Sequence, residues 1–195
     1  MDNDQAFSEM PVNAKAGKFN AEKVKIGRAA ADLVQNGDTV LMDSGTTTLE
    51  VARNLKEKKI TVITTALNVA IELSPSPDID ILVAGGVLRK GPLSTTGPQT
   101  DTFIQELHVD KAFIGVEGVD VQSGISVLDP VNAHNKQTMI EIARQVIVVA
   151  DHSKLGRTTT SNIAPLDKVN VVITDNGADP AIVEELRRKT QVVLV

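Results

Sequence analysis

The spacing of apolar residues along the chain predicts alternating helices and strands. From residue 20, apolar side chains recur at the i, i+3, i+4, i+7, i+8 positions of one helix face, and Asn36-Gly37, a pair typical of helix ends, follows. These side chains are Ile26, Ala29, Ala30, Leu33 and Val34. Short apolar runs then alternate with helical patterns, at 39–42, 60–64, 79–84, 111–116, 146–150, 169–174 and 192–195. Continuous apolar strands between helices predict an α/β fold, a largely parallel sheet with helices on both faces.

Two helix starts are marked by an acidic residue followed by proline. Asp129-Pro130 and Asp179-Pro180 each place an N-cap acid before a proline at the first helical position. They predict helices from Pro130 to about Arg144 and from Pro180 to Lys189. Residues 1–19 have no periodicity and are interpreted as an arm or linker, and residues 20–195 as one domain.

Composition limits the classes of function. The chain has 195 residues, a net charge of −5, no Trp or Tyr and four Phe, which argues against a surface that grips nucleic acid by itself. It has no cysteine, so disulfides and thiolate-bound metals are excluded. No apolar run is long enough to cross a membrane, and the first residues lack the pattern of a secretory signal. A cytoplasmic protein without membrane partner is expected.

Residues 44–48, Ser-Gly-Thr-Thr-Thr, place four hydroxyl groups and a glycine between the strand at 39–42 and the next helix. In parallel sheets, ligands lie beyond the carboxyl ends of the strands. A helix that begins near Thr46 presents unpaired N–H groups there, and Gly45 allows close approach. Hydroxyl donors are added by Ser44, Thr46, Thr47 and Thr48. One hydroxyl could simply cap the helix, but four favour a site for a phosphate group.

Neighbouring strand ends show similar residues. Thr64 and Thr65 end the strand at 60–64, and Gly85-Gly86 with Arg89 follow the strand at 79–84. Each could be an ordinary turn. Lys154 lies after the strand at 146–150 and is either a solvated loop residue or a charge aimed at the crevice. No metal-ligand spacing occurs among His108, His134 and His152, and no cofactor or metal is expected.

An ordered set of motifs resembles the effector-sensing domain of the DeoR family of bacterial transcriptional repressors. The set runs from about residue 22 to 176 and comprises "EKVKIGRAAADLVQNGDTVLMDSGTTTLEVARNL", "TVITTALNVAIEL", "LVAGGVLR", "STTG", "VDKAFIGVEGVDVQSGIS", "NKQTMIEIA", "ADHSKLG" and "VVITD". The resemblance implies a fold similar to ribose-5-phosphate isomerase and coenzyme A transferases. It also implies a phosphorylated sugar as effector.

The resemblance to the isomerase assigns roles to residues. It implies that the effector's phosphate meets Lys23, Ser44, Gly45, Thr46, Thr47, Thr48, Thr64 and Thr65. It implies that the sugar is near Asp43, Gly85, Gly86, Arg89, Glu117, Gly118 and Lys154. The isomerase's Asp-x-Ser-Lys motif matches Asp151 to Lys154, but its acid–base motif falls on "GVEGV" (115–119), where only Glu117 is acidic. Its lysine-containing glycine motif falls on "QSGIS" (122–126), which has no lysine. Isomerisation needs both groups, so a sensor rather than an enzyme is predicted.

The resemblance further implies partners. The family usually has an N-terminal winged helix-turn-helix, which this chain lacks, so operator DNA is expected to bind only through that missing domain. A homo-oligomer, dimer or tetramer, is expected. An active sugar-phosphate isomerase and an oligomerisation module with a vestigial pocket are the two alternatives.

Overall fold

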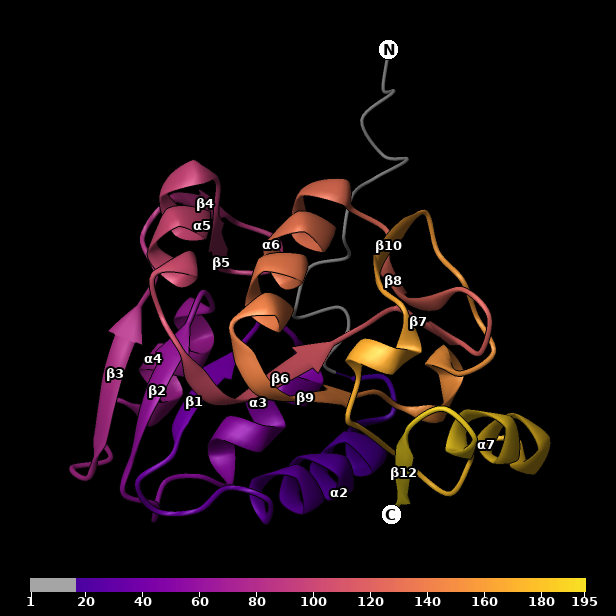
Figure 1. Ribbon diagram of the computed structural model, residues 1–195. Helices are drawn as coiled ribbons and strands as arrows, with labels where there is room; N and C mark the ends of the chain where they lie inside the picture. Colours follow the sequence, from indigo (N-terminus) through magenta and orange to yellow (C-terminus); the bar gives the residue numbers. More distant parts are fainter. Residues whose placement is uncertain (1–16) are drawn as a thin grey trace.

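The computed structural model describes residues 17–195 and is built around a seven-stranded sheet (Figure 1). The strand order is β12-β11-β9-β6-β1-β2-β3, and every neighbouring pair is parallel. The strands are β1 (Thr39–Met42), β2 (Ile60–Thr64), β3 (Ile79–Val83), β6 (Val109–Gly115), β9 (Ala143–Val149), β11 (Val171–Thr174) and β12 (Gln191–Leu194). The predicted α/β class with a largely parallel sheet is confirmed.

Helices cover both faces of this sheet, as its continuous apolar strands require. On one face lie α2 (Asn20–Ala31), α3 (Thr46–Arg53) and α4 (Leu67–Leu73), and on the other α5 (Pro98–Gln105), α6 (Pro130–Glu141) and α7 (Pro180–Arg187). Strand β1 illustrates the division. Val40 and Met42 join the core under α2, α3 and α4, while Leu41 between them joins the core on the opposite face.

Two small antiparallel sheets were not predicted. A hairpin of β4 (Val87–Arg89) and β5 (Ser94–Thr96) follows β3, and β7 (Gly118–Asp120), β8 (Gly124–Val127) and β10 (Ser161–Ala164) form a three-stranded sheet. These strands are three or four residues long and rich in Gly, Ser and Thr, so they lack the long apolar runs that mark the central strands. Helix α5 was also missed, because only two of its side chains are buried, Thr100 and Ile104.

Helix starts were predicted better than helix ends. The Asp129 carboxylate accepts hydrogen bonds from the backbone N–H groups of Val131 and Asn132, and Asp179 caps α7 in the same way through Ala181. Helix α2 begins at Asn20, but it ends at Ala31, well before the predicted Asn36-Gly37. The apolar pattern continues past the helix because Leu33 and Val34 lie in a tight turn that still packs on the core. Of the predicted arm at 1–19, residues 1–16 lie outside the described residues.

A glycine lets α2 and α3 touch directly. A Cβ atom added to Gly27 would lie 2.6 Å from the backbone carbonyl carbon of Glu50, which is closer than carbon atoms pack. The two helices therefore meet backbone to backbone. One turn before these residues lie Lys23 on α2 and Thr46–Thr47 on α3, so the close contact brings Lys23 beside the hydroxyl-rich loop.

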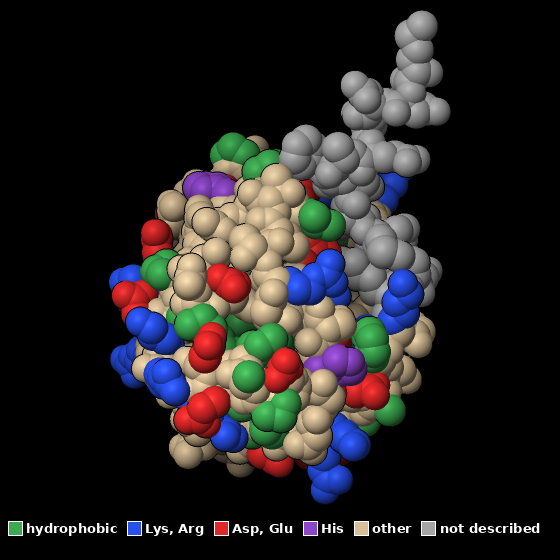
Figure 2. All heavy atoms as spheres, turned by 90° about the vertical axis from the view of Figure 1, so that its right-hand side faces the viewer, with side chains coloured by type: hydrophobic (Ala, Val, Ile, Leu, Met, Phe, Trp, Pro, Cys, Tyr) green, Lys and Arg blue, Asp and Glu red, His purple; other side chains and the backbone are tan. Residues whose placement is uncertain are grey.

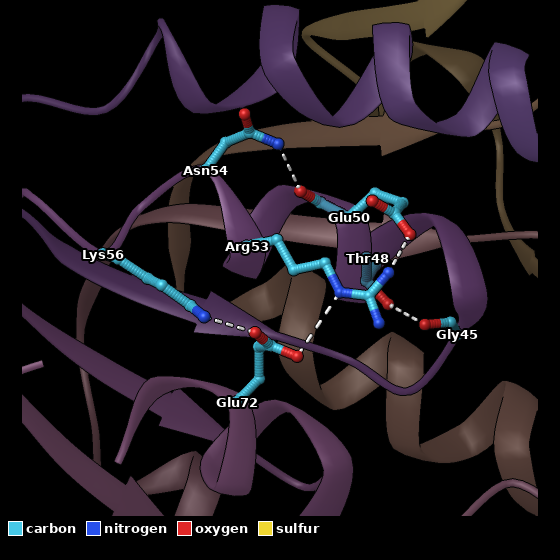
Figure 3. Close-up of polar contacts among 7 residues, drawn as sticks. All are labelled: Gly45, Thr48, Glu50, Arg53, Asn54, Lys56 and Glu72. Atoms are coloured by element: carbon cyan, nitrogen blue, oxygen red, sulfur yellow. Dashed lines mark hydrogen bonds and ion pairs between the residues drawn. The ribbon is translucent and has the colours of Figure 1, made fainter. Parts of the chain in front are cut away.

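Ion pairs tie α3 to α4 on the outer side of the same layer (Figure 3). Arg53 contacts Glu50 on its own helix at 2.5 Å and Glu72 of α4 at 3.3 Å, and Lys56 contacts Glu72 at 2.5 Å. The Lys56 ammonium and the Arg53 guanidinium hold the pKa of the Glu72 carboxyl below its ordinary value. Among residues 17–195, no helix is long and apolar enough to cross a membrane.

Candidate functional site: a basic pocket at the strand ends

The sheet reverses its winding direction between β1 and β6. After β1 the chain continues to β2 on one side, and after β6 it continues to β9 on the other. Open α/β sheets bind ligands in the crevice that such a reversal leaves beyond the carboxyl ends of the strands. A cavity of about 430 Å³ lies at this point, which is the size range of small-molecule sites.

The hydroxyl-rich loop forms one wall of the cavity. Ser44, Gly45, Thr46 and Thr47 line it. The N-cap residue of α3 is Gly45, so no side chain caps the first N–H groups of this helix. The Thr48 hydroxyl lies outside the lining and donates to the Gly45 carbonyl at 3.0 Å, which stiffens the turn (Figure 3). The wall thus combines two hydroxyl-bearing threonines with the positive end of a helix.

Basic side chains dominate the charged part of the lining. Five of its residues are basic and two are acidic, although the whole chain has a net charge of −5. The basic residues are Lys18, Lys23, Lys136, Lys154 and Arg157, and the acidic ones are Glu117 and Asp151. A local excess of positive charge in a concave, partly buried site favours an anionic ligand.

A buried ion pair forms the floor. Lys136 of α6 pairs with Asp43, the residue after β1, and each side chain is only 2% exposed. The same Asp43 oxygen accepts the Gly115 N–H at 3.0 Å, which joins the ends of β1 and β6. Removing one partner of such a pair would leave a buried charge without compensation.

Lys136 was not predicted from the sequence. The segment "QSGIS" has no lysine, but the structure brings a lysine to the pocket from α6 instead. The pattern that could have revealed it is the polar character of the buried side of α6, where Asn132, Asn135 and Lys136 are all buried. Apolar periodicity does not detect such a helix face.

The far wall comes from the ends of β6 and β9. Glu117 lines the pocket, and its carboxylate accepts the Leu128 N–H at 2.8 Å. Asp151 accepts the Ser153 N–H at 3.1 Å and so caps the short helix η1 (His152–Lys154). Lys154 lines the pocket, which places it at the crevice rather than in a solvated loop.

The start of α2 closes the remaining side. Lys18, Phe19 and Lys23 line the pocket, and Lys23 Nζ donates to the Lys18 carbonyl at 2.6 Å. The Phe19 ring meets the His152 ring edge-on at 4.8 Å between centroids. His152 Nδ1 is in turn 2.7 Å from Asp175 Oδ2.

Asp175 is held in its ionised form. Burial alone would raise the pKa of its carboxyl, but hydrogen bonds from the His152 and Gly177 backbone N–H groups and from the His152 ring together lower this pKa below the ordinary value. This carboxylate therefore anchors the loop that carries His152 and Lys154.

Besides Thr48 and Asp43, six predicted ligand residues lie outside the lining and make contacts within the fold. The Thr64 hydroxyl donates to the Met42 carbonyl at 2.8 Å and accepts the Ala66 N–H at 3.0 Å. The Thr65 carbonyl accepts the Thr95 N–H at 2.8 Å. Arg89 pairs with Asp129, the N-cap of α6.

The three remaining glycines have structural surroundings. The Gly85 carbonyl accepts the Thr100 hydroxyl at 2.5 Å. Gly86 has a φ of +135°, and a Cβ there would lie 2.2 Å from the Thr100 hydroxyl oxygen. A Cβ on Gly118 would lie 2.5 Å from the Arg157 carbonyl oxygen. This glycine therefore allows the backbone at Arg157 to pack directly against β7. No cluster of three or more potential metal ligands occurs among residues 17–195.

Comparison with known proteins identifies the family. The model of the DeoR C-terminal sensor domain matches residues 18–176. The chain belongs to the DeoR family. It is 37% identical over 190 residues to the transcriptional repressor AccR of Agrobacterium fabrum, covering 95% of this chain and 74% of that protein. It is 33% identical over 166 residues to the glycerol-3-phosphate regulon repressor of Escherichia coli, covering 85% of this chain and 66% of that protein.

These relatives are named as repressors, which agrees with the prediction of a regulator rather than an enzyme. The chain spans about two thirds to three quarters of their length. Ribose-5-phosphate isomerase A of Methanocaldococcus jannaschii superposes with a TM-score of 0.52 at 18% identity, over 70% of this chain and 55% of that one. This likeness confirms the fold alone.

Proposed function

We propose that this DeoR-family sensor domain binds a small phosphorylated sugar or sugar-like phosphate in the basic pocket. We further propose that binding alters how a winged helix-turn-helix in the same protein holds operator DNA. The observation that supports this most directly is the convergence of Lys23, Lys154, Arg157 and the α3 N-terminus on one cavity. Such groups suit a dianionic phosphate.

Two parts of the cavity suit two parts of the ligand. The phosphate would meet the wall of Ser44 to Thr47 together with Lys23, where hydroxyl, N–H and ammonium donors converge. The hydroxyl-bearing carbon chain would extend toward Glu117 and the Lys136–Asp43 pair, which offer both acceptors and a donor. The Escherichia coli relative is named for the glycerol-3-phosphate regulon, and glycerol 3-phosphate is a small phosphorylated polyol, which agrees with this class of ligand.

The start of α2 supplies a route for the signal. Lys23 Nζ donates to the Lys18 carbonyl, so a ligand phosphate in the pocket would compete for the same ammonium group. The segment that carries Lys18 and Phe19 would then have a different preferred position in the free and bound forms. A ligand can shift a regulator only through such differential interaction with two states.

Calorimetric titration tests the ligand class. A sugar phosphate should bind at least about a hundredfold more tightly than its unphosphorylated parent, because each charge-assisted hydrogen bond contributes about 1.5–3 kcal/mol. Lys23→Ala should weaken binding of the sugar phosphate but leave the weak affinity for the free sugar unchanged. Equal affinity for a sugar and its phosphate would contradict the proposal. Equal affinity of the parent and the Lys23→Ala variant for the sugar phosphate would show that the phosphate does not lie against the Ser44 to Thr47 wall.

A further inference from the structure

We infer that the open edge of β3 is a self-association surface, on which a second copy of this chain pairs its own β3 antiparallel about a two-fold axis at Ile81. Strand β3 is the last strand on its side of the seven-stranded sheet, and no described strand lies beyond it (Figure 1). An unpaired edge presents a row of backbone donors and acceptors, and such an edge is a template for another strand.

The backbone of β3 shows which groups are open. The Ala84 N–H donates to the Thr64 carbonyl, and the Asp78 carbonyl accepts the Ile60 N–H. Backbone groups alternate in direction along a strand, so the even-numbered residues bond to β2. The odd-numbered residues Ile81 and Val83 therefore point their N–H and C=O groups away from β2, toward the open edge of the sheet.

This alternation matches a two-fold axis at Ile81. Antiparallel pairing about that axis places Ile81 opposite the Ile81 of the second copy and Ile79 opposite Val83. Both pairs join odd-numbered residues. The outward N–H of each Ile81 would thus donate to the C=O of the other Ile81, which makes the two residues a hydrogen-bonded pair. The side chains brought together are apolar and β-branched, which suits cross-strand contact.

Exposed apolar side chains gather on this side of the molecule. Of nine large hydrophobic residues exposed among residues 17–195, five belong to α4, β3 or the hairpin, which lie together at the left of Figure 1. They are Ile71, Val83, Val87, Leu88 and Leu93. The opposite edge strand, β12, carries one of the nine, Leu194. On the face turned toward the viewer in Figure 2, hydrophobic side chains are instead scattered among charged ones.

Charge is also complementary across the proposed axis. The exposed acids Asp78 and Asp80 lie at the start of β3, and the exposed Lys90 lies in the hairpin beyond its end. An antiparallel arrangement turns the acidic end of each strand toward the hairpin of the other copy. A parallel arrangement would instead align acid with acid. Because one chain carries both the acidic end and the basic hairpin, the pattern is self-complementary and favours a second copy as the partner.

Sedimentation velocity and disulfide cross-linking test this surface on the full 195-residue chain. The parent should sediment as a dimer of about 41.6 kDa, twice the 20.8 kDa chain mass. Ile81→Pro should give a monomer, because proline removes an outward N–H that an isolated edge strand does not need. Val83→Lys should do the same. Its matched control is Val24→Lys on α2, since Val24 is 45% exposed and Val83 42%, and this control should remain dimeric.

The absence of native cysteine makes cross-linking specific. Ile81→Cys should form a dimer on mild oxidation, since hydrogen-bonded antiparallel partners have Cα atoms about 5.5 Å apart, within disulfide range. Val24→Cys should not. A monomeric parent at every concentration would overturn the inference, and so would a dimer that Ile81→Pro and Val83→Lys leave intact. If both variants misfold by circular dichroism, an Ile81→Cys chain that fails to cross-link overturns it independently.

Discussion

Two neighbouring loops contain the same kind of residue and use it differently. The loop after β1 directs Thr46 and Thr47 at the pocket, whereas the Thr64 hydroxyl after β2 is bonded to Met42 and Ala66 inside the fold. The residue types are alike and the strands are adjacent. What differs is position, because β1 borders the reversal of the sheet and β2 does not.

This contrast shows how the fold divides its polar groups. Beside the reversal, the chain leaves β1 and β6 in opposite directions, so the polar groups at their ends face an open space. Beyond β2, the hairpin of β4 and β5 covers the strand end, and the backbone N–H and hydroxyl of Thr95 donate hydrogen bonds to the Thr65 carbonyl. Hydroxyl groups under that cover complete the hydrogen bonds of the fold. They are thus expected to affect stability, and those beside the reversal to affect binding.

The largest expected effect is on stability and comes from the Lys136–Asp43 pair. This pair lies beside the reversal, yet it supports the fold, so it is an exception to the division between binding and stability. Lys136→Ala should reduce the free energy of unfolding by about 3–5 kcal/mol, because Asp43 would remain as a buried charge without its partner. Urea denaturation measures this loss. Lys154→Ala, a lysine in the same lining but half-buried, is the control and should change stability by less than about 0.5 kcal/mol. Equal losses would show that Lys136 has no special role.

A matched pair of substitutions tests the contrast directly. Thr64→Val should lower the free energy of unfolding by about 1–3 kcal/mol, because the Met42 carbonyl and the Ala66 N–H lose their buried partner. Thr47→Val should leave stability nearly unchanged and weaken sugar-phosphate binding roughly twofold to tenfold, through loss of one neutral donor. Thermal unfolding measures the change in stability of each variant, and calorimetry measures the change in its affinity for the sugar phosphate. The contrast fails if Thr47→Val proves the more destabilising change.

The smallest expected effect is a pH-dependent change in stability from Asp175, an acidic residue that follows β11 and stabilises the fold. The pKa of Asp175 is lowered in the folded protein, so its carboxylate contributes stability above the unfolded pKa, near 3.8, and this contribution disappears as pH falls through the folded value. Asp175→Asn should therefore be less stable than the parent at pH 7. The gap should stay constant down to about pH 5 and shrink below about pH 4. Urea midpoints that differ equally at pH 3 and pH 7 would contradict this assignment.

The central strands could be predicted from the sequence because they are buried on both faces. The runs at 39–42 and 60–64 coincide with β1 and β2 residue for residue. Strand β8 and the hairpin could not be predicted, since strands of three or four residues that mix apolar residues with Gly, Ser, Thr or Arg suit a turn equally well. Their positions depend on what they pack against, such as Gly124 of β8 against the Ala164 carbonyl.

The same limit applies to the site. A consecutive motif such as Ser44 to Thr47 falls on one loop whatever the tertiary structure, so its place on a strand end could be predicted. Lys136 reaches the pocket only because α6 crosses above the ends of β1 and β6, and no local pattern encodes that crossing. Arg89 shows the converse, since a basic residue after a strand end resembles a phosphate ligand until its pairing with Asp129 is known.

Direct backbone contact at Gly27 makes α2 and α3 a mechanically stiff pair. Side chains interposed between two helices can rotate and absorb a displacement, but backbone atoms in van der Waals contact cannot. The ion pair between Arg53 and Glu72 in addition joins α3 to α4 on the outer side. A ligand that shifts the loop after β1 by a fraction of an ångström would therefore displace the start of α2 by a similar amount. Lys18 and Phe19, which precede α2 and line the pocket, would move with it.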